Sequence, residues 1–136
     1  MPDVLFLCTG NSCRSQMAEG WLRHLAGDRF RAYSAGLKPG VVHPLAIEAM
    51  REAGVDISGQ QSKDVASLLR QQFSHVITVC DRARDSCPVF PGSSIREHWS
   101  IEDPATAEGS HGERMLVFRA IRDEIGARVR GFLDGA

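Results

Sequence analysis

The stretch Cys8-Thr9-Gly10-Asn11-Ser12-Cys13-Arg14-Ser15 joins an apolar run at residues 4–7 to a helical pattern of apolar residues that begins at Met17. The pattern predicts a tight turn that leads from a buried strand into the first turn of a helix. Such a turn directs unpaired backbone N–H groups and the positive end of the helix dipole at one point. It is therefore predicted to bind an oxyanion through Thr9, Gly10, Asn11, Ser12, Cys13 and Arg14.

Two side chains give this turn its chemical character. Cys8 lies at one end and Arg14 lies at the other, with five residues between them. A thiol beside a helix N-terminus and a guanidinium ionises readily and is then a nucleophile, and the planar fork of arginine suits a tetrahedral oxyanion. The turn therefore predicts an activated thiol in an oxyanion site. The alternative is a buried cysteine followed by an ordinary surface turn.

The chain has 136 residues and a formal net charge of −1. This length predicts a single domain over residues 1–136. The charge argues against binding to nucleic acid or to a membrane surface. No apolar run approaches the roughly 20 residues of a membrane span, and the N-terminus lacks the features of a secretion signal, so a cytoplasmic location is expected. The protein is also expected to be a monomer.

Alternating strand and helix patterns predict the fold. Strands are predicted at residues 4–7, 30–35, 75–79 and 94–99. Helices are predicted from the turn to Gly27, with Ser15 as the cap, from Pro44 to Gly54, at residues 65–69 and at residues 113–133. This order indicates an α/β fold with a doubly wound, four-stranded parallel sheet and helices on both faces. Residues 81–91 are predicted to form a loop that contains a helical turn.

Three further cysteines follow Cys8, namely Cys13, Cys80 and Cys87. In a reducing compartment, cysteines are expected to be catalytic, redox-active or metal-binding rather than a structural framework. Cys13 is interpreted as a small side chain packed beneath the turn. A zinc site is disfavoured because the closely spaced ligand pairs of such sites are missing. Cys80 and Cys87 are either a redox pair or two unrelated cysteines.

The geometry of a parallel sheet favours the redox interpretation. Ligand sites lie beyond the carboxyl ends of the strands, and Cys8 and Cys80 both follow predicted strands. If these strands are neighbours, they lie about 4.8 Å apart and the two thiols come within disulfide reach. Cys87 differs, because seven helical steps span roughly 10.5 Å and a disulfide needs Cα atoms closer than about 7 Å. A helical segment between Cys80 and Cys87 would have to unwind before the two could join.

Asp103 precedes Pro104 in a loop after the last predicted strand. An Asp-Pro pair is usually a simple turn. Beside a nucleophilic thiol, however, such a carboxyl is a candidate general acid for a departing oxygen. The five histidines show no metal-ligand spacing and are interpreted as structural or surface residues.

Taken together, these motifs resemble the low-molecular-weight protein tyrosine phosphatases and, within that fold, the thioredoxin-coupled arsenate reductases. The resemblance extends over essentially the whole chain, through residues 8–21, 34–36, 55–58, 62–64, 79–80, 87–88 and 99–104. Cys80 and Cys87 favour the reductases, because a simple phosphatase does not need them. The aromatic residues that the phosphatases carry after Asp-Pro are replaced here by residues 105–107, Ala-Thr-Ala.

The resemblance implies a first chemical step at the turn. The Cys8 thiolate attacks arsenate, for which phosphate and sulfate are analogues. Asp103 protonates the departing oxygen, and Ser15 donates a hydrogen bond that helps to hold Cys8 as a thiolate.

The resemblance also implies a disulfide relay. Cys80 attacks Cys8 and releases arsenite, Cys87 then attacks Cys80, and thioredoxin reduces the final disulfide. Weak phosphatase activity is expected to accompany reduction. The alternative functions are phosphomonoester or phosphotyrosine hydrolysis through a Cys8 phosphocysteine and, outside enzymes, an anion-binding or redox-sensing module.

No cofactor is expected to be required, but the resemblance implies a potassium site near the turn. The matching positions carry oxygen ligands suited to a hard cation. They are Asn11, Glu19, Ser34 and Asp64.

Overall fold

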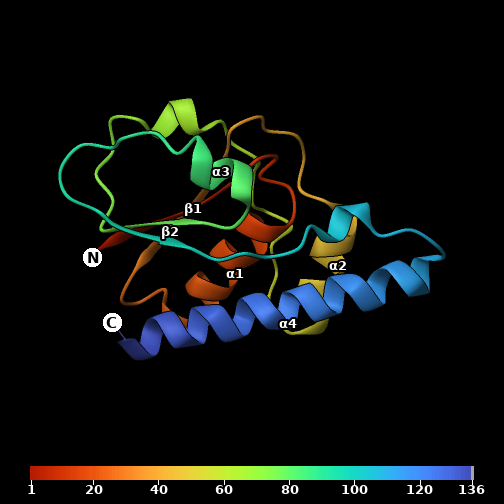
Figure 1. Ribbon diagram of the computed structural model, residues 1–136. Coiled ribbons are helices and arrows are strands. Elements are labelled where there is room, and N and C mark those ends of the chain that lie inside the picture. The colour runs from red at the N-terminus through yellow and green to blue at the C-terminus, as the bar shows by residue number, and fades with distance from the viewer. Residues whose placement is uncertain (136) are drawn as a thin grey trace.

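A four-stranded parallel sheet lies at the centre of the computed structural model, which describes residues 1–135 (Figure 1). The strand order is β2-β1-β3-β4. The strands are β1 (Asp3–Cys8), β2 (Arg31–Gly36), β3 (His75–Thr78) and β4 (Ile95–His98). The predicted parallel sheet of four strands is confirmed, with strand ends within one residue of the predicted positions.

Helices cover the two faces of the sheet unequally. Helices α1 (Arg14–Ala26), α2 (Pro44–Glu52) and α4 (His111–Gly135) lie on one side (Figure 1). The other side carries the short helix α3 (Asp81–Asp85) and the 3₁₀ helix η1 (Val65–Leu68) (Figure 1). A second 3₁₀ helix, η2 (Pro104–Thr106), precedes α4. The prediction of helices on both faces is therefore confirmed. Within residues 1–135, no helix has both the length and the apolar character that a membrane span needs.

Strand β1 organises the sheet because both of its neighbours pair with it in parallel. Residues Val4 to Leu7 are fully buried, as expected for a strand covered on both faces. In the register, Cys8 lies opposite Gly36 of β2 and Leu7 lies opposite Thr78 of β3. Cys8 and Cys80 therefore follow the carboxyl ends of adjacent strands, as predicted.

Two helix starts differ from prediction. Helix α1 begins at Arg14 with Cys13 as its N-cap and without a side-chain cap bond, so the prediction that Ser15 caps this helix is wrong. The Ser15 hydroxyl instead contacts Cys8 and Asn11. Helix α4 begins at residue 111, two residues earlier than predicted, because Ser110 and Glu113 form a capping box with two bonds of 3.1 Å. Hydrophobic periodicity does not detect such a polar start.

His43 caps helix α2 and makes stability sensitive to pH. Its Nδ1 accepts a hydrogen bond from the Leu45 N–H at 3.1 Å, and its ring packs against Phe118. Burial lowers the pKa of His43, and the charge of Arg114 lowers it further. The unfolded chain, in which histidine has a pKa of about 6.5, therefore takes up the proton first as the pH falls. Neutral His43 therefore contributes to the free energy of unfolding above about pH 6.5. That contribution is lost as the pH falls through the pKa of His43 in the folded protein.

We expect His43→Asn to reduce this pH dependence, because asparagine caps helices well and does not titrate. Urea midpoints measured at pH 7.5 and pH 5.5 test this expectation. The parent protein should lose more stability on acidification than the variant. An equal loss in both proteins would show that His43 does not set this dependence.

Candidate active site

The turn predicted from the sequence forms a closed loop over residues 8–14, which we call the oxyanion loop. Its carbonyl groups bond outward, because Thr9 O accepts from the Lys38 N–H at 2.8 Å and Ser12 O accepts from the His43 N–H at 3.0 Å. Asn11 has a φ of 49°, in the left-handed region that asparagine tolerates better than most residues. With its carbonyls turned outward, the loop is shaped to present N–H groups to its centre.

Cys8 lies buried at the start of the oxyanion loop, with two hydrogen-bonding partners at its sulfur. Its Sγ accepts from the Asn11 N–H at 3.1 Å and lies 2.8 Å from Ser15 Oγ. Ser15 Oγ already accepts a bond from Asn11 Nδ2 at 2.8 Å, which leaves its own hydrogen free for the sulfur. Two donors directed at one sulfur stabilise a thiolate. The predicted contact between Ser15 and Cys8 is therefore present.

Arg14 and Asp103 meet at the open side of the loop. Arg14 Nη1 donates to Ile101 O at 2.9 Å, and Arg14 Nη2 lies 3.7 Å from Asp103 Oδ2. Asp103 Oδ1 accepts from the Ala105 N–H at 3.0 Å, which caps η2 and fixes the carboxyl. The structure thus brings the predicted acid to the predicted oxyanion ligand. The Asp103 side chain is 40% exposed and can exchange protons with water.

Cys80 approaches the oxyanion loop from the neighbouring strand. Its Sγ lies 3.4 Å from the hydroxyl of Thr9, the residue that follows Cys8. The same sulfur accepts from the Ala83 N–H at 3.4 Å, so Cys80 also caps α3. The cysteine predicted to be second in the relay is therefore buried and contacts the residue that follows the first.

Cys87 follows helix α3 and is half-buried. Arg96 of β4 donates to its sulfur through Nη1 at 3.0 Å. Burial raises the pKa of Cys87, whereas the charge and the hydrogen bond of Arg96 act to lower it. All four cysteines are free thiols.

Cys13 is separated chemically from these three thiols. It is buried, and burial raises its pKa to about 12. It is therefore protonated at neutral pH and a poor nucleophile. This state agrees with its interpretation as a packed side chain.

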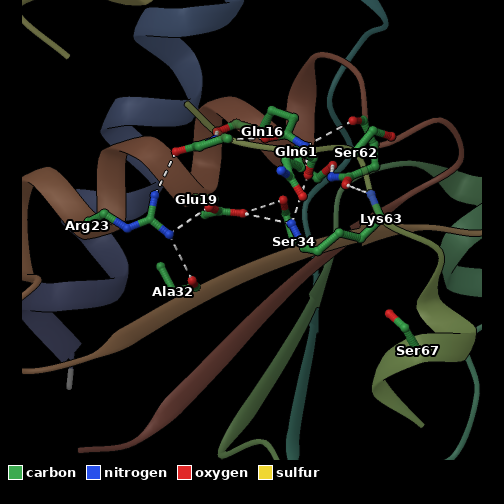
Figure 2. A network of polar contacts seen from close by, with 12 residues as sticks. Gln16, Glu19, Arg23, Ala32, Ser34, Gln61, Ser62, Lys63 and Ser67 are labelled. Carbon is green, nitrogen blue, oxygen red and sulfur yellow. Dashed lines mark hydrogen bonds and ion pairs between the residues drawn. The ribbon is translucent and has the colours of Figure 1, made fainter. Parts of the chain in front are cut away.

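The four residues predicted to bind potassium form only part of a cation site. Figure 2 shows Glu19 between Ser34 and Arg23, with Lys63 nearby. The buried Glu19 carboxylate accepts from Ser34 Oγ at 2.5 Å and from Arg23 Nη2 at 2.6 Å, and Lys63 Nζ lies 3.8 Å from it. Its two oxygens therefore already face two cationic side chains.

The other two predicted ligands are also engaged. Asn11 Oδ1 accepts from the Lys63 N–H at 2.8 Å, and Asp64 Oδ1 accepts from the Ala66 N–H at 2.8 Å, which caps η1. Among residues 1–135 there is no group of three or more His, Cys, Asp and Glu side chains placed to hold a metal ion. As arranged, these residues do not fit a bound potassium ion.

Fold and site together define a class of enzyme in which a cysteine nucleophile and an arginine share an oxyanion loop. The profile of the family described as low molecular weight phosphotyrosine protein phosphatase matches residues 3–135. An arsenate reductase of Halalkalibacterium halodurans is 49% identical over 131 residues, which cover 96% of this chain and 94% of the relative.

Two solved structures add detail. An arsenate reductase in a phosphate-binding state has a TM-score of 0.80 and 36% identity, covering 99% of this chain and 98% of its own. A thioredoxin-dependent arsenate reductase of Corynebacterium glutamicum has a TM-score of 0.74 and 32% identity, covering 99% of this chain and 61% of its own. The chain therefore belongs to the low molecular weight phosphotyrosine protein phosphatase family and, within it, to the arsenate reductases. The resemblance inferred from the sequence is confirmed.

Proposed function

We propose that this protein reduces arsenate to arsenite through Cys8, Cys80 and Cys87, and that thioredoxin regenerates it. The observation that carries the proposal is the position of Cys80. Its sulfur lies 3.4 Å from the hydroxyl of Thr9, the residue that follows the nucleophile, and Cys80 itself follows the strand that pairs with that of Cys8. A phosphatase reaction makes no use of a second thiol at that place.

In the first step, the Cys8 thiolate attacks arsenic while Arg14 and the N–H groups of the oxyanion loop hold the arsenate oxygens. A sulfur–arsenic bond forms, and one oxygen leaves as water after Asp103 gives it a proton. Arsenic is still pentavalent in this adduct. The Asn11 N–H and the Ser15 hydroxyl are both placed to donate to the Cys8 sulfur.

In the second step, the Cys80 thiolate attacks the Cys8 sulfur. A disulfide forms, the sulfur–arsenic bond breaks, and its electron pair stays on arsenic, which leaves as arsenite. Cys87 then attacks Cys80 and releases Cys8 as a thiolate. A dithiol protein such as thioredoxin supplies the two electrons that reduce the Cys80–Cys87 disulfide.

Helix α3 has to open during this exchange. It spans Asp81–Asp85 between the two cysteines, and its helical rise holds Cys80 and Cys87 apart, with an upper bound of roughly 10.5 Å for seven fully helical steps. A disulfide requires Cα atoms within about 7 Å. We therefore expect the backbone of residues 81–90 to differ between crystals of the reduced and the Cys80–Cys87-oxidised protein, with α3 unwound in the oxidised form. The same backbone in both crystals would contradict this part of the relay.

Weak hydrolysis of small aryl phosphates is a second candidate activity. Arsenate and phosphate are nearly isosteric, and Cys8, Arg14 and Asp103 are sufficient for phosphoryl transfer to a cysteine and on to water. Residues 105–107 offer no aromatic ring to stack on a phenol. We therefore propose that phosphatase activity is minor and does not favour phosphotyrosine.

A coupled assay tests the main proposal. Purified protein is mixed with thioredoxin, thioredoxin reductase and NADPH, and the absorbance of NADPH is followed after arsenate is added. The proposal predicts arsenate-dependent oxidation that requires thioredoxin. The absence of that signal, in a preparation that still hydrolyses an aryl phosphate, would favour the phosphatase alternative.

We also propose that no bound cation is required, because Arg23 and Lys63 balance the charge of Glu19. The melting temperature should then be equal in potassium chloride and choline chloride at one ionic strength. Lys63→Gln should create a stabilisation specific to potassium, whereas Lys38→Gln, which removes the exposed second lysine, should not. A potassium-specific stabilisation of the parent protein would restore the site predicted from the sequence.

A further inference from the structure

Arg96 is the one side chain of the edge strand β4 that reaches the last thiol of the proposed relay. Its Nη1 donates to Cys87 Sγ at 3.0 Å, and its Nη2 donates to Pro88 O at 2.7 Å. The two nitrogens of one planar fork therefore hold the sulfur and the following carbonyl together. Such a contact fixes both the position of the thiol and the direction of the chain that leaves it.

The surroundings of Cys87 make this contact chemically significant. Cys87 lies in a small pocket between α3 and the strands β3 and β4, lined by Val76, Thr78, Arg84, Arg96, Glu97 and His98. Its half-burial disfavours the thiolate that the last exchange needs. A neighbouring positive charge is required to offset that effect.

Of the charged groups that line the pocket, Arg96 is the one bonded to the sulfur. Arg84 pairs with Asp85 at 3.1 Å, and His98 contacts Asp81 at 3.0 Å. Glu97 accepts from Trp99 Nε1 at 3.1 Å. The other ionisable groups of the pocket are therefore paired elsewhere. Arg96 is the group whose positive charge stabilises the Cys87 thiolate.

We propose that Arg96 is a positioning residue for the second disulfide exchange, in which it holds Cys87 as the attacking thiolate. This inference rests on the relay proposed above. The Cys87 proton goes to solvent, the Cys87–Cys80 bond forms, the Cys8–Cys80 bond breaks, and Cys8 leaves as a thiolate. Once Cys87 is in the disulfide its charge is gone, and its hydrogen bond with Arg96 Nη1 weakens.

The test compares Arg96→Gln and Arg96→Lys with the parent protein. Arg51→Gln is the matched control, because it removes an exposed arginine from α2, on the opposite side of the sheet. The first readout is the pH profile of Cys87 alkylation by iodoacetamide, followed by mass spectrometry. Cleavage at Arg82 and Arg84 places Cys80 and Cys87 in separate tryptic peptides. The second readout is the rate at which the Cys8–Cys80 disulfide becomes Cys80–Cys87 after one turnover with arsenate.

We expect Arg96→Gln to shift the alkylation profile of Cys87 toward higher pH and to slow the transfer at pH 7 by about three- to tenfold. The effect stays within this range because the variant has less Cys87 thiolate at pH 7, but that thiolate is a stronger nucleophile. The difference in transfer rate between Arg96→Gln and the parent should narrow toward pH 10. Arg96→Lys should give intermediate values in both readouts, and Arg51→Gln should match the parent in both. Hydrolysis of an aryl phosphate should not change.

An unchanged alkylation profile in Arg96→Gln would overturn the proposal even if turnover fell, because a merely structural role moves turnover without moving the profile. The two proposals fail in different ways. If the parent forms no Cys80–Cys87 disulfide with arsenate, the relay fails, whereas the alkylation profile still reports on the contact between Arg96 and Cys87.

Discussion

Replacing Cys80 by serine is expected to abolish arsenate turnover, with a loss of about a thousandfold or more, equivalent to about 4 kcal/mol in the barrier. Without the second thiol, the arsenic on Cys8 has no electron donor, and the adduct only hydrolyses back to arsenate. Hydrolysis of a small aryl phosphate should persist, because that reaction uses Cys8, Arg14 and Asp103 and needs no second thiol. Steady-state rates for both substrates measure this contrast.

Two further variants complete the comparison. Cys87→Ser should also lose thioredoxin-coupled turnover while it retains phosphatase activity. Cys8→Ser should lose both activities, since both begin with its thiolate. If Cys80→Ser lost both activities in a folded protein, Cys80 would have a role beyond the relay and the separation of functions drawn here would be wrong.

Replacing Gly36 by alanine is expected to reduce both activities by about a hundredfold. Gly36 ends β2 opposite Cys8, and an added Cβ would lie 2.6 Å from Thr9 O and 3.0 Å from the Asn11 N. Both neighbours are backbone atoms of the oxyanion loop, so the loop itself must move. A displacement of about 1 Å at a catalytic group costs on the order of a hundredfold in rate, and overpacking typically costs about 1–3 kcal/mol of stability.

Gly59→Ala is the matched control for this substitution, because an added Cβ there meets no atom within 4 Å. Rates with arsenate and with an aryl phosphate, together with urea unfolding, measure the effect. The control should match the parent protein in all three. A folded Gly36→Ala variant with the parent's rates would mean that the oxyanion loop does not depend on this close approach.

Much of the fold follows from local patterns in the sequence. Residues 4–7 read as a strand buried on both faces because they are continuously apolar, and Cys8 follows them at the sheet edge where ligands bind. The spacing of Cys8 and Arg14 predicts an oxyanion site, and the structure places Asp103 beside Arg14. The adjacency of Cys8 and Cys80 followed once β1 and β3 were taken as neighbours.

Contacts between segments that are far apart in the sequence could not be predicted from local patterns. The guanidinium of Arg96 reaches Cys87 only because α3 and the loop after it pack beside β4, and nothing near Arg96 in the sequence signals this contact. Gly36 directly follows the strand predicted at residues 30–35, and in the fold it makes room for the backbone of the oxyanion loop. Ser15 is a partner of Cys8, as predicted, but it is not the helix cap, because α1 begins at Arg14 and Ser15 lies within its first turn.

The potassium site, transferred by matching residues, stays a prediction. Ser34 and Glu19 are in contact, and Arg23 and Lys63 supply positive charge to the Glu19 carboxylate. Arg23 lies one helical turn after Glu19, a spacing that favours an ion pair and was visible in the sequence. The approach of Lys63 to Glu19 depends on the path of the loop after α2, and the sequence gives no sign of it.

Disulfide mapping after a single turnover tests the relay most directly. The fully reduced protein is mixed with excess arsenate in the absence of thioredoxin, quenched in acid, unfolded and alkylated, and its disulfides are mapped by mass spectrometry while arsenite is quantified. The relay predicts about one arsenite per chain, a disulfide between Cys80 and Cys87, and alkylated Cys8 and Cys13. Four alkylated cysteines without arsenite, or a disulfide that includes Cys13, would contradict it.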